Sequence, residues 1–235
     1  MSNLTLNSIF KRLLNYYGPQ GWWPLYSKAG GYSEYKGQLP SSFAELFEIS
    51  AGAVLAQNVS WKNAEKAVAR LKTEGILDPE KLLNNPGRKT GLLIRSSGYY
   101  NQKTIKLKNL SSWFISRGYT LKKLKSMDPA ALRQELLSIK GIGPETADSI
   151  LLYGLDMKYF VVDAYLKRIF SRLGLLEQNV SYDTAQEFCH RKFKGSTPDY
   201  REFHALIVCH AVTFCKKKPA CEGCIFSGRC TDSRL

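Results

Sequence analysis

The feature that most constrains the fold of this chain is a pair of glycines, Gly141 and Gly143, placed between two apolar helical patterns. The range 128–139 predicts a first helix, because an aspartate cap and a proline precede a stripe of leucines. The glycines flank Ile142 and let the backbone turn tightly. A second helix is expected over 144–155. The pattern therefore predicts a helical hairpin whose outward N–H groups could hold a phosphate.

A single aspartate, Asp163, follows the hairpin at the end of the buried run 160–162 and directly before another amphipathic helix. An aspartate in this position is usually only an N-cap. The same carboxylate could also stabilise an oxocarbenium-like sugar and orient or deprotonate a water that attacks C1′. Because the hairpin lies upstream at a suitable distance, we favour a catalytic role for Asp163.

The segment 137–148, Leu-Ser-Ile-Lys-Gly-Ile-Gly-Pro-Glu-Thr-Ala-Asp, followed by Asp163, resembles the helix-hairpin-helix plus Gly/Pro…Asp motif of the endonuclease III superfamily of DNA glycosylases. The resemblance extends from about Trp22 through Gln57 and 98–103 to the C-terminal cysteines. It implies that the aspartate is essential for breaking the N-glycosidic bond. It also implies that the hairpin contacts backbone phosphate through Lys140, Gly141, Ile142 and Gly143.

Glu145 departs from the pattern of the bifunctional members of that family. These carry at the matching position a lysine whose amine attacks C1′ and forms a Schiff base before strand cleavage. A carboxylate cannot form that imine, so the resemblance implies a monofunctional glycosylase that uses water and has no AP-lyase activity. Glu145 also suits the first turn of its helix, where negative charge meets the helix dipole.

Two adjacent tryptophans, Trp22 and Trp23, cannot both face inward on one helix, so we expect at least one to line a cleft. Tyr26 and Phe47 are further candidates for stacking on a flipped base. With Pro24, the tryptophans resemble the alkyl-base pocket of bacterial 3-methyladenine glycosylases of the endonuclease III type. These enzymes also carry glutamate at the hairpin's lysine position. The resemblance therefore implies alkylated purines as substrate, first 3-methyladenine and second 7-methylguanine.

Gln57 and Asn58 follow the end of a predicted apolar helix. They resemble the family segment whose glutamine enters the double helix and fills the space left by the flipped base. The alternative is a polar helix C-cap. The longer side chain favours Gln57 for the space-filling role.

Four of the six cysteines lie close together near the C-terminus with the spacing C-x5-C-x2-C-x5-C: Cys215, Cys221, Cys224 and Cys230. This resembles the family's [4Fe–4S] loop, with the first interval one residue shorter than in its better-known members. Zinc is the competing occupant, although zinc sites more often use two C-x2-C knuckles. We expect a structural cluster. Cys189 and Cys209 are interpreted as core residues, and His204 and His210 as packed or capping groups.

Basic residues outnumber acidic ones in this chain, with 34 Lys and Arg against 20 Asp and Glu and a net charge of +14. Such a balance favours a polyanionic partner, and with the hairpin it predicts binding to double-stranded DNA that contains damaged bases. The first fifteen residues hold no continuous apolar core, so we expect no secretory signal, no membrane partner and a cytoplasmic, nucleoid-associated protein.

Strand signals are nearly absent apart from the solitary pair 161–162, so the chain predicts an all-α fold of two helical lobes with a cleft between them. Helix starts are expected at Ser41 or Ser42 and at Asp78, a glycine-punctuated connection at 87–91, and a long basic helix over 99–115. A monomer is expected, because one polypeptide supplies both lobes. The predicted segments are 1–38, an N-terminal part of the terminal lobe and base pocket; 39–155, a lobe with the hairpin at 129–155; and 156–235, with the catalytic aspartate and the cysteine loop at 215–230.

The leading hypothesis is thus a monofunctional glycosylase for alkylated purines in base excision repair. A glycosylase for a deaminated, mismatched or oxidised base is the alternative within the class. A non-catalytic helix-hairpin-helix DNA-binding protein is the alternative outside it.

Overall fold

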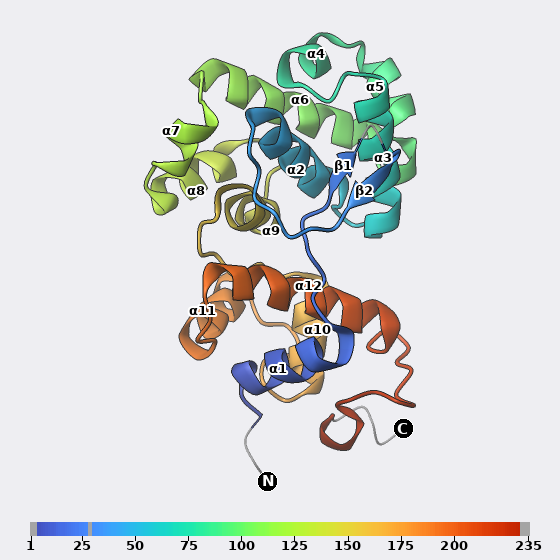
Figure 1. Cartoon of the computed structure of the whole chain (residues 1–235), viewed down its shortest axis with the longest axis vertical. Coiled ribbons are helices and arrows are strands. Elements are labelled where there is room, and N and C mark those ends of the chain that lie inside the picture. Colours follow the sequence, from blue (N-terminus) through green and yellow to red (C-terminus); the bar gives the residue numbers. More distant parts are fainter. Residues whose placement is uncertain (1–3, 28–29, 231–235) are drawn as a thin grey trace. The chain divides into compact units, whose positions relative to one another are not determined.

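The computed structural model describes residues 4–27 and 30–230 (Figure 1). The chain divides into two compact units, one made of residues 1–22 and 158–235 and the other of residues 23–157. The predicted all-α class is confirmed, with one small β-hairpin in addition. No helix in the described part of the chain is both long and apolar enough to cross a membrane.

The first unit joins the N-terminal helix to the C-terminal helices. Its central helix is α12, which packs against both α1 and α10 (Figure 1). Aromatic rings fill the space between the helices, and Phe203 of α12 lies against Phe10, Phe160 and Phe193. The elements of this unit are α1 (Leu6–Tyr17), α10 (Ala164–Arg172), α11 (Tyr182–Lys192), α12 (Thr197–Thr213) and a 3-10 turn (Ser227–Arg229).

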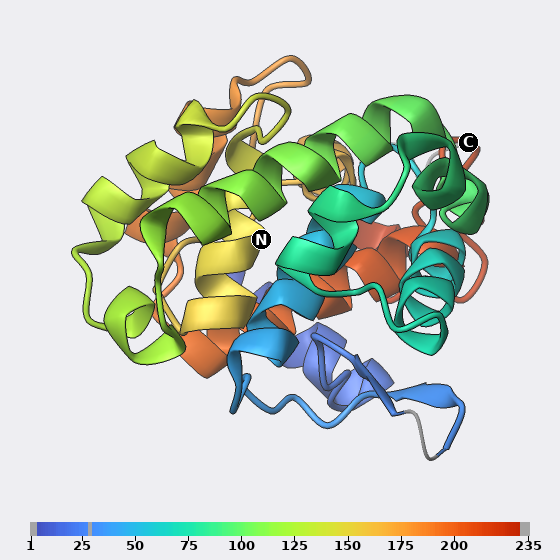
Figure 2. The same cartoon turned by 90° about the horizontal axis from the view of Figure 1, so that it is seen from above.

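The second unit is built around α2 (Phe43–Leu55), in which every residue from Leu46 to Leu55 is buried. Such a helix has no polar face because neighbours cover it on all sides. The neighbours that contact it include α3, α6 and α9, and Figure 2 shows this arrangement with α2 in light blue. The other elements are β1 (Leu25–Ser27), β2 (Tyr32–Glu34), α3 (Trp61–Thr73), α4 (Pro79–Asn84), α5 (Gly87–Leu93), a 3-10 turn (Arg95–Ser97), α6 (Tyr100–Arg117), α7 (Leu121–Lys125), α8 (Pro129–Ser138), α9 (Pro144–Ser149) and a π-helical turn (Ile150–Gly154).

Two local predictions were wrong. The glycine-punctuated connection at 87–91 is helical and forms part of α5. Packing explains the glycine at position 91 instead, since a Cβ there would lie 3.2 Å from the ring of Tyr100 on α6. The residues 161–162 are not a strand, whereas β1 and β2 pair antiparallel with Tyr26 opposite Ser33. Strands of three residues are too short to show a period of two.

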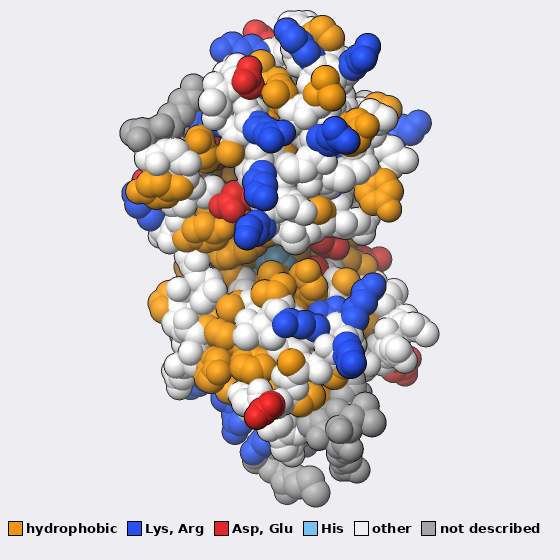
Figure 3. All heavy atoms as spheres, turned by 90° about the vertical axis from the view of Figure 1, so that its right-hand side faces the viewer, with side chains coloured by type: hydrophobic (Ala, Val, Ile, Leu, Met, Phe, Trp, Pro, Cys, Tyr) orange, Lys and Arg blue, Asp and Glu red, His pale blue; other side chains and the backbone are white. Residues whose placement is uncertain are grey.

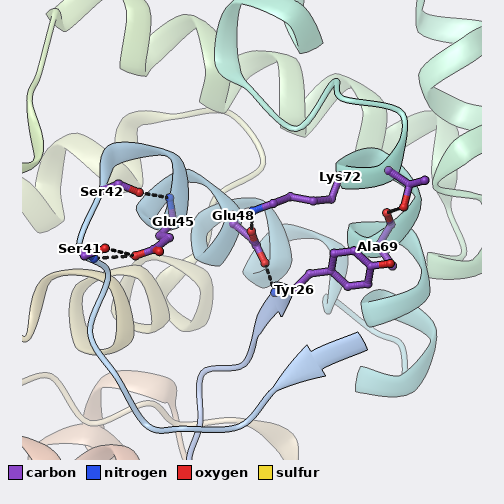
Figure 4. Close-up of polar contacts among 8 residues, drawn as sticks. Tyr26, Ser41, Ser42, Glu45, Glu48, Ala69 and Lys72 are labelled. Atoms are coloured by element: carbon purple, nitrogen blue, oxygen red, sulfur yellow. Dashed lines mark hydrogen bonds and ion pairs between the residues drawn. The ribbon is translucent and has the colours of Figure 1, made fainter. Parts of the chain in front are cut away.

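A buried carboxylate attaches this small hairpin to the helices behind it. Glu48 on α2 accepts a hydrogen bond from the backbone N–H of Tyr26 at 2.5 Å and forms an ion pair with Lys72 on α3 (Figure 4). The predicted helix start at Ser41 or Ser42 is confirmed, because Ser42 accepts a hydrogen bond from the N–H of Glu45 at 3.2 Å (Figure 4). The contacts of Glu48 thus attach β1 to α2 and α3 within the second unit.

A buried amine supports the end of α2. Lys103 of α6 donates to the carbonyl oxygens of Leu55 at 2.7 Å and Ser97 at 2.6 Å. Burial lowers the pKa of Lys103 to about 8, and repulsion from Lys106 acts in the same direction. The amine therefore stays mostly protonated at neutral pH, where it caps the negative end of the α2 dipole. The hydrogen bond to Leu55 thus fixes the end of α2, from which the turn with Gln57 begins.

Candidate active site

The predicted helical hairpin is present, with α8 ending at Ser138 and α9 beginning at Pro144. Gly141 has φ +100°, a conformation that strongly favours glycine. Gly143 differs from the expectation that both glycines serve the turn, because its φ of −98° and ψ of 178° are extended backbone that any residue adopts. A Cβ on Gly143 would meet nothing within 4 Å, so no intramolecular contact requires glycine there.

Two side chains of α6 contact the hairpin turn. The aliphatic part of Lys106 lies against Gly141, where an added Cβ would come within 2.5 Å of its Cγ. Asn109 donates to the carbonyl of Lys140 at 2.9 Å. Sequence reasoning described this helix only as long and basic. It could not find these two residues, because their role depends on a hairpin far away in the chain.

Gln57 contacts the hairpin directly. Its Nε2 donates to the carbonyl of Gly141 at 3.2 Å and to the hydroxyl of Thr146 at 2.9 Å, and its Oε1 accepts from Nζ of Lys106 at 2.5 Å. The neighbouring Asn58 is exposed and has φ 54°. The turn after α2 and the hairpin are therefore one hydrogen-bonded surface within the second unit.

The two hairpin helices are joined by a buried ion pair. Arg133 of α8 donates from Nε and Nη2 to the two carboxylate oxygens of Asp148 on α9, at 2.6 and 3.1 Å. The Asp148 side chain is fully buried. Beyond α9 the helix widens into the π-helical turn, where a Cβ on Gly154 would come within 2.6 Å of Leu46. These contacts fix the hairpin on the core of its unit.

Glu145 is exposed in the first turn of α9. The position suits a carboxylate, since negative charge is favourable beside the first N–H groups of a helix. The side chain is thus on the surface of the second unit, next to the hairpin turn.

The five aromatic-pocket candidates are divided between the units. Trp23 is buried and packs edge-on against Trp61 and Tyr153, with ring centroids 4.9 and 5.2 Å apart. Phe47 is fully buried against Phe114. In the second unit, Pro24 is also buried and Tyr26 half-buried, whereas Trp22 is a half-buried residue of the first unit. Trp61 and Tyr153 are aromatic neighbours that the sequence did not point to.

Asp163 is the N-cap of α10 in the first unit. Its Oδ1 accepts from the N–H of Leu166 at 2.7 Å, so the capping interpretation is confirmed. Its Oδ2 lies 3.7 Å from Nε2 of His204 on α12, and both side chains are buried. An ionised carboxylate has about four acceptor sites, so the cap leaves capacity for a water molecule.

The four C-terminal cysteines line one pocket, together with Arg172 and His210. Burial raises the pKa of the Cys224 thiol, and the other three thiols add to the effect. An N–H of Arg172 points to the sulfur of Cys215 at 3.3 Å. Within residues 4–27 and 30–230, no three His, Cys, Asp or Glu side chains are arranged to hold a metal ion.

His210 lies on the wall of this pocket, with Nε2 3.6 Å from the sulfur of Cys224 and Nδ1 2.9 Å from the hydroxyl of Tyr17. Burial lowers the pKa of His210 to about 4, so it is neutral at neutral pH. Cys189 is fully buried and Cys209 half-buried. On the face drawn in Figure 3, many Lys and Arg side chains are exposed, with several Asp and Glu side chains among them.

Comparison with known proteins places these features in a family. Residues 51–194 match the model of the HhH-GPD superfamily base excision DNA repair proteins. The chain is 44% identical over 218 residues to a Methanocaldococcus jannaschii protein named "Putative DNA repair glycosylase", an alignment that covers 92% of this chain and 91% of the relative.

Solved structures agree with this assignment. The Helicobacter pylori 3-methyladenine DNA glycosylase MagIII, bound to 1,N6-ethenoadenine, superposes with a TM-score of 0.68 and 27% identity, covering 87% of this chain and 96% of that one. Endonuclease III in a non-covalent DNA complex superposes with a TM-score of 0.76 at 18% identity, covering 98% and 97%, and shows the same fold. The chain therefore belongs to the HhH-GPD superfamily and is a base-excision DNA glycosylase.

Proposed function

We propose that the protein is a monofunctional glycosylase that hydrolyses the N-glycosidic bond of alkylated purines, with 3-methyladenine as the first substrate and 7-methylguanine as the second. The observation that carries the monofunctional assignment is Glu145, exposed in the first turn of the second hairpin helix, where bifunctional relatives use a lysine. The likeness to a 3-methyladenine glycosylase at 27% identity supports the substrate class.

Asp163 is the proposed catalytic residue. Its carboxylate, held by the N–H of Leu166, orients a water molecule and accepts one of its protons as the water oxygen bonds to C1′. The bond from C1′ to the base nitrogen breaks, and its electron pair leaves with the base. An alkylated purine carries a positive charge that this electron pair neutralises, so strong protonation of the leaving group is unnecessary. The other product is an abasic site in an intact strand.

Aromatic surfaces provide the proposed recognition of the base. A cationic purine between aromatic faces gains on the order of 2 kcal/mol from cation–π attraction in a desolvated slot. Trp22, Trp23, Pro24, Tyr26 and Phe47 remain the proposed set, with Trp23 supported by Trp61 and Tyr153. Phe47 is fully buried, so its part in such a pocket is to support other rings.

The hairpin is the proposed phosphate contact, through Lys140, Gly141, Ile142 and Gly143. Gln57 remains the proposed residue that fills the space left by the flipped base. Its three hydrogen bonds to Gly141, Thr146 and Lys106 hold it in one conformation beside the hairpin. The proposed space-filling residue and the proposed phosphate contact therefore belong to one surface of the second unit.

The two hairpin glycines provide a matched test of this contact. We expect Gly141→Ala to lower the free energy of unfolding by about 1–3 kcal/mol, because its backbone is strained for any side chain. Gly143→Ala should change it by less than about 1 kcal/mol, since its backbone is extended. The methyl group that Gly143→Ala adds should weaken binding to duplex DNA by about 10-fold if a phosphate approaches Gly143. That loss is equivalent to about 1.4 kcal/mol. Urea unfolding and fluorescence anisotropy measure the two effects, and unchanged binding by Gly143→Ala would argue against the contact.

A [4Fe–4S] cluster bound by Cys215, Cys221, Cys224 and Cys230 is the proposed cofactor. The four thiols line one pocket, and the N–H of Arg172 is suited to a thiolate of Cys215, so the chemistry of the donor set supports this proposal. In the described part of the chain these thiols are not arranged around a single ion, which is consistent with the proposal, because a four-iron cluster needs its thiolates farther apart than one metal ion does. When bound, the cluster would hold the loop together and do no chemistry on the base. The loop's own Lys216, Lys217 and Lys218 are then available to meet DNA phosphate.

The proposed function is tested by base release from duplex DNA that carries methylated purines. Released bases are identified by chromatography, and the strands are examined before and after alkali. We expect free 3-methyladenine and strand breaks that appear only after alkali. Breaks without alkali would show that a lysine acts despite Glu145. No release of any methylated base would overturn the substrate assignment in favour of deaminated, mismatched or oxidised bases, which a second panel of duplexes would identify.

A further inference from the structure

We infer that His204 is a positioning residue for Asp163, an inference that rests on the proposed catalytic role of that aspartate. The two side chains come from different helices of the first unit. His204 lies in the middle of α12, and Asp163 caps the start of α10. Nε2 of His204 is 3.7 Å from Oδ2 of Asp163, the oxygen that does not accept the capping hydrogen bond.

The burial of His204 supports this inference. The residue is 6% exposed, and its neighbours Phe203, Ala205, Leu206 and Ile207 are all buried as well. An imidazole among apolar side chains loses its contacts with water, and this cost must be offset by a polar partner. The carboxylate of Asp163, itself 7% exposed, is such a partner.

The two contacts together restrict the carboxylate in a way that the cap alone does not. The N–H of Leu166 fixes Oδ1. A carboxylate held by one hydrogen bond at one oxygen can still tilt about that contact through small changes of χ1 and χ2, which moves the other oxygen. His204 attracts Oδ2 from α12 and so selects one orientation of the carboxylate plane. Orientation matters because a catalytic group displaced by about 1 Å can lose about 10²-fold in rate.

The contact of His204 is long for a hydrogen bond, so its effect is electrostatic orientation and not a second cap. His204 acts through Asp163 and has no assigned contact with substrate. Its effect on base release should therefore exist only while Asp163 is present.

Single-turnover base release from methylated duplex DNA tests the inference in a double-mutant cycle. We expect His204→Leu to lower the rate by on the order of 10²-fold with unchanged DNA affinity. His204→Gln retains an N–H donor and should recover part, but not all, of that loss. In an Asp163→Asn background, His204→Leu should change the remaining rate by less than about 3-fold, because coupled residues are not additive.

His190 provides a matched control, since this histidine of α11 accepts from the N–H of Phe160 at 3.2 Å and belongs to the same unit. His190→Leu should have a stability comparable to that of His204→Leu and should release base at the wild-type rate. A second readout is independent of activity, because His204→Leu should speed hydrogen exchange of the Leu166 amide while His190→Leu should not.

Two results would overturn the inference alone: a folded His204→Leu protein with the wild-type rate, or an equal loss in the presence and absence of the Asp163 carboxylate. Full activity of Asp163→Asn would instead overturn the proposed function, and this inference with it. If His204→Leu does not fold, the Gln variant decides, because it should release base more slowly than wild type and should add nothing to Asp163→Asn.

Discussion

Replacing Asp163 by asparagine is expected to lower the single-turnover rate of base release by about 10²- to 10⁴-fold while leaving DNA binding unchanged. Asparagine is as good an N-cap as aspartate, so its side-chain oxygen can still accept from the N–H of Leu166 and α10 should keep its start. The carboxamide cannot accept the proton of the attacking water. The substitution therefore removes the proposed catalytic role of the side chain while it keeps the N-cap hydrogen bond. Base release and DNA affinity are measured on the same preparation.

Asp128→Asn is the control for this prediction. Asp128 is also an aspartate N-cap, and it accepts from the N–H of Ala131 at 2.8 Å at the start of α8. The same substitution there should leave base release within about 2-fold, because that cap has no proposed chemical role. Equal rates for both variants would mean that Asp163 is only a cap.

Replacing Arg133 by methionine is expected to lower the free energy of unfolding by about 3–5 kcal/mol. The substitution leaves the carboxylate of Asp148, fully buried on α9, without its bidentate partner on α8. A buried charge that loses its bidentate ion-pair partner is costly, and here the pair lies between the two helices of the hairpin. We also expect weaker DNA binding, because the hairpin turn loses its support. Urea unfolding followed by circular dichroism measures the change in stability.

Arg117→Met provides the comparison, since Arg117 pairs with Glu135 at 3.4 Å on the surface and is 51% exposed. That loss should cost no more than about 1 kcal/mol. The double variant Arg133→Met with Asp148→Leu should regain most of the stability, because it removes both charges. A double variant as unstable as Arg133→Met would show that packing of the arginine, and not the orphaned charge, causes the loss.

Local patterns predicted much of the fold. The helix starts at Ser42, Asp78 and Asp128 are present as capping hydrogen bonds, and the hairpin lies where its glycines indicated. The two failures have different physical causes. A three-residue strand is too short for a pattern, and Gly91 was taken as a turn residue because its packing partner Tyr100 lies on another helix.

The site was predicted less completely than the fold. Asp163, Glu145 and the four cysteines were proposed from their spacing and from the family resemblance, and the structure adds what surrounds them. Lys106 contacts Gln57 across 49 positions of the chain, and no periodicity or motif signals such a pair. His204 was predicted to be a packed group, and only the neighbouring helix shows that its contact is a carboxylate.

By itself the sequence determined the helical class, the glycine hairpin and an aspartate at a helix start, because these depend on interactions within one or two turns. Only the tertiary structure decided that, of the two hairpin glycines, Gly141 has a backbone that requires glycine, that α6 and Gln57 support the hairpin, and that His204 faces Asp163. These contacts join residues far apart in the chain, and their distances depend on how whole helices pack within each unit.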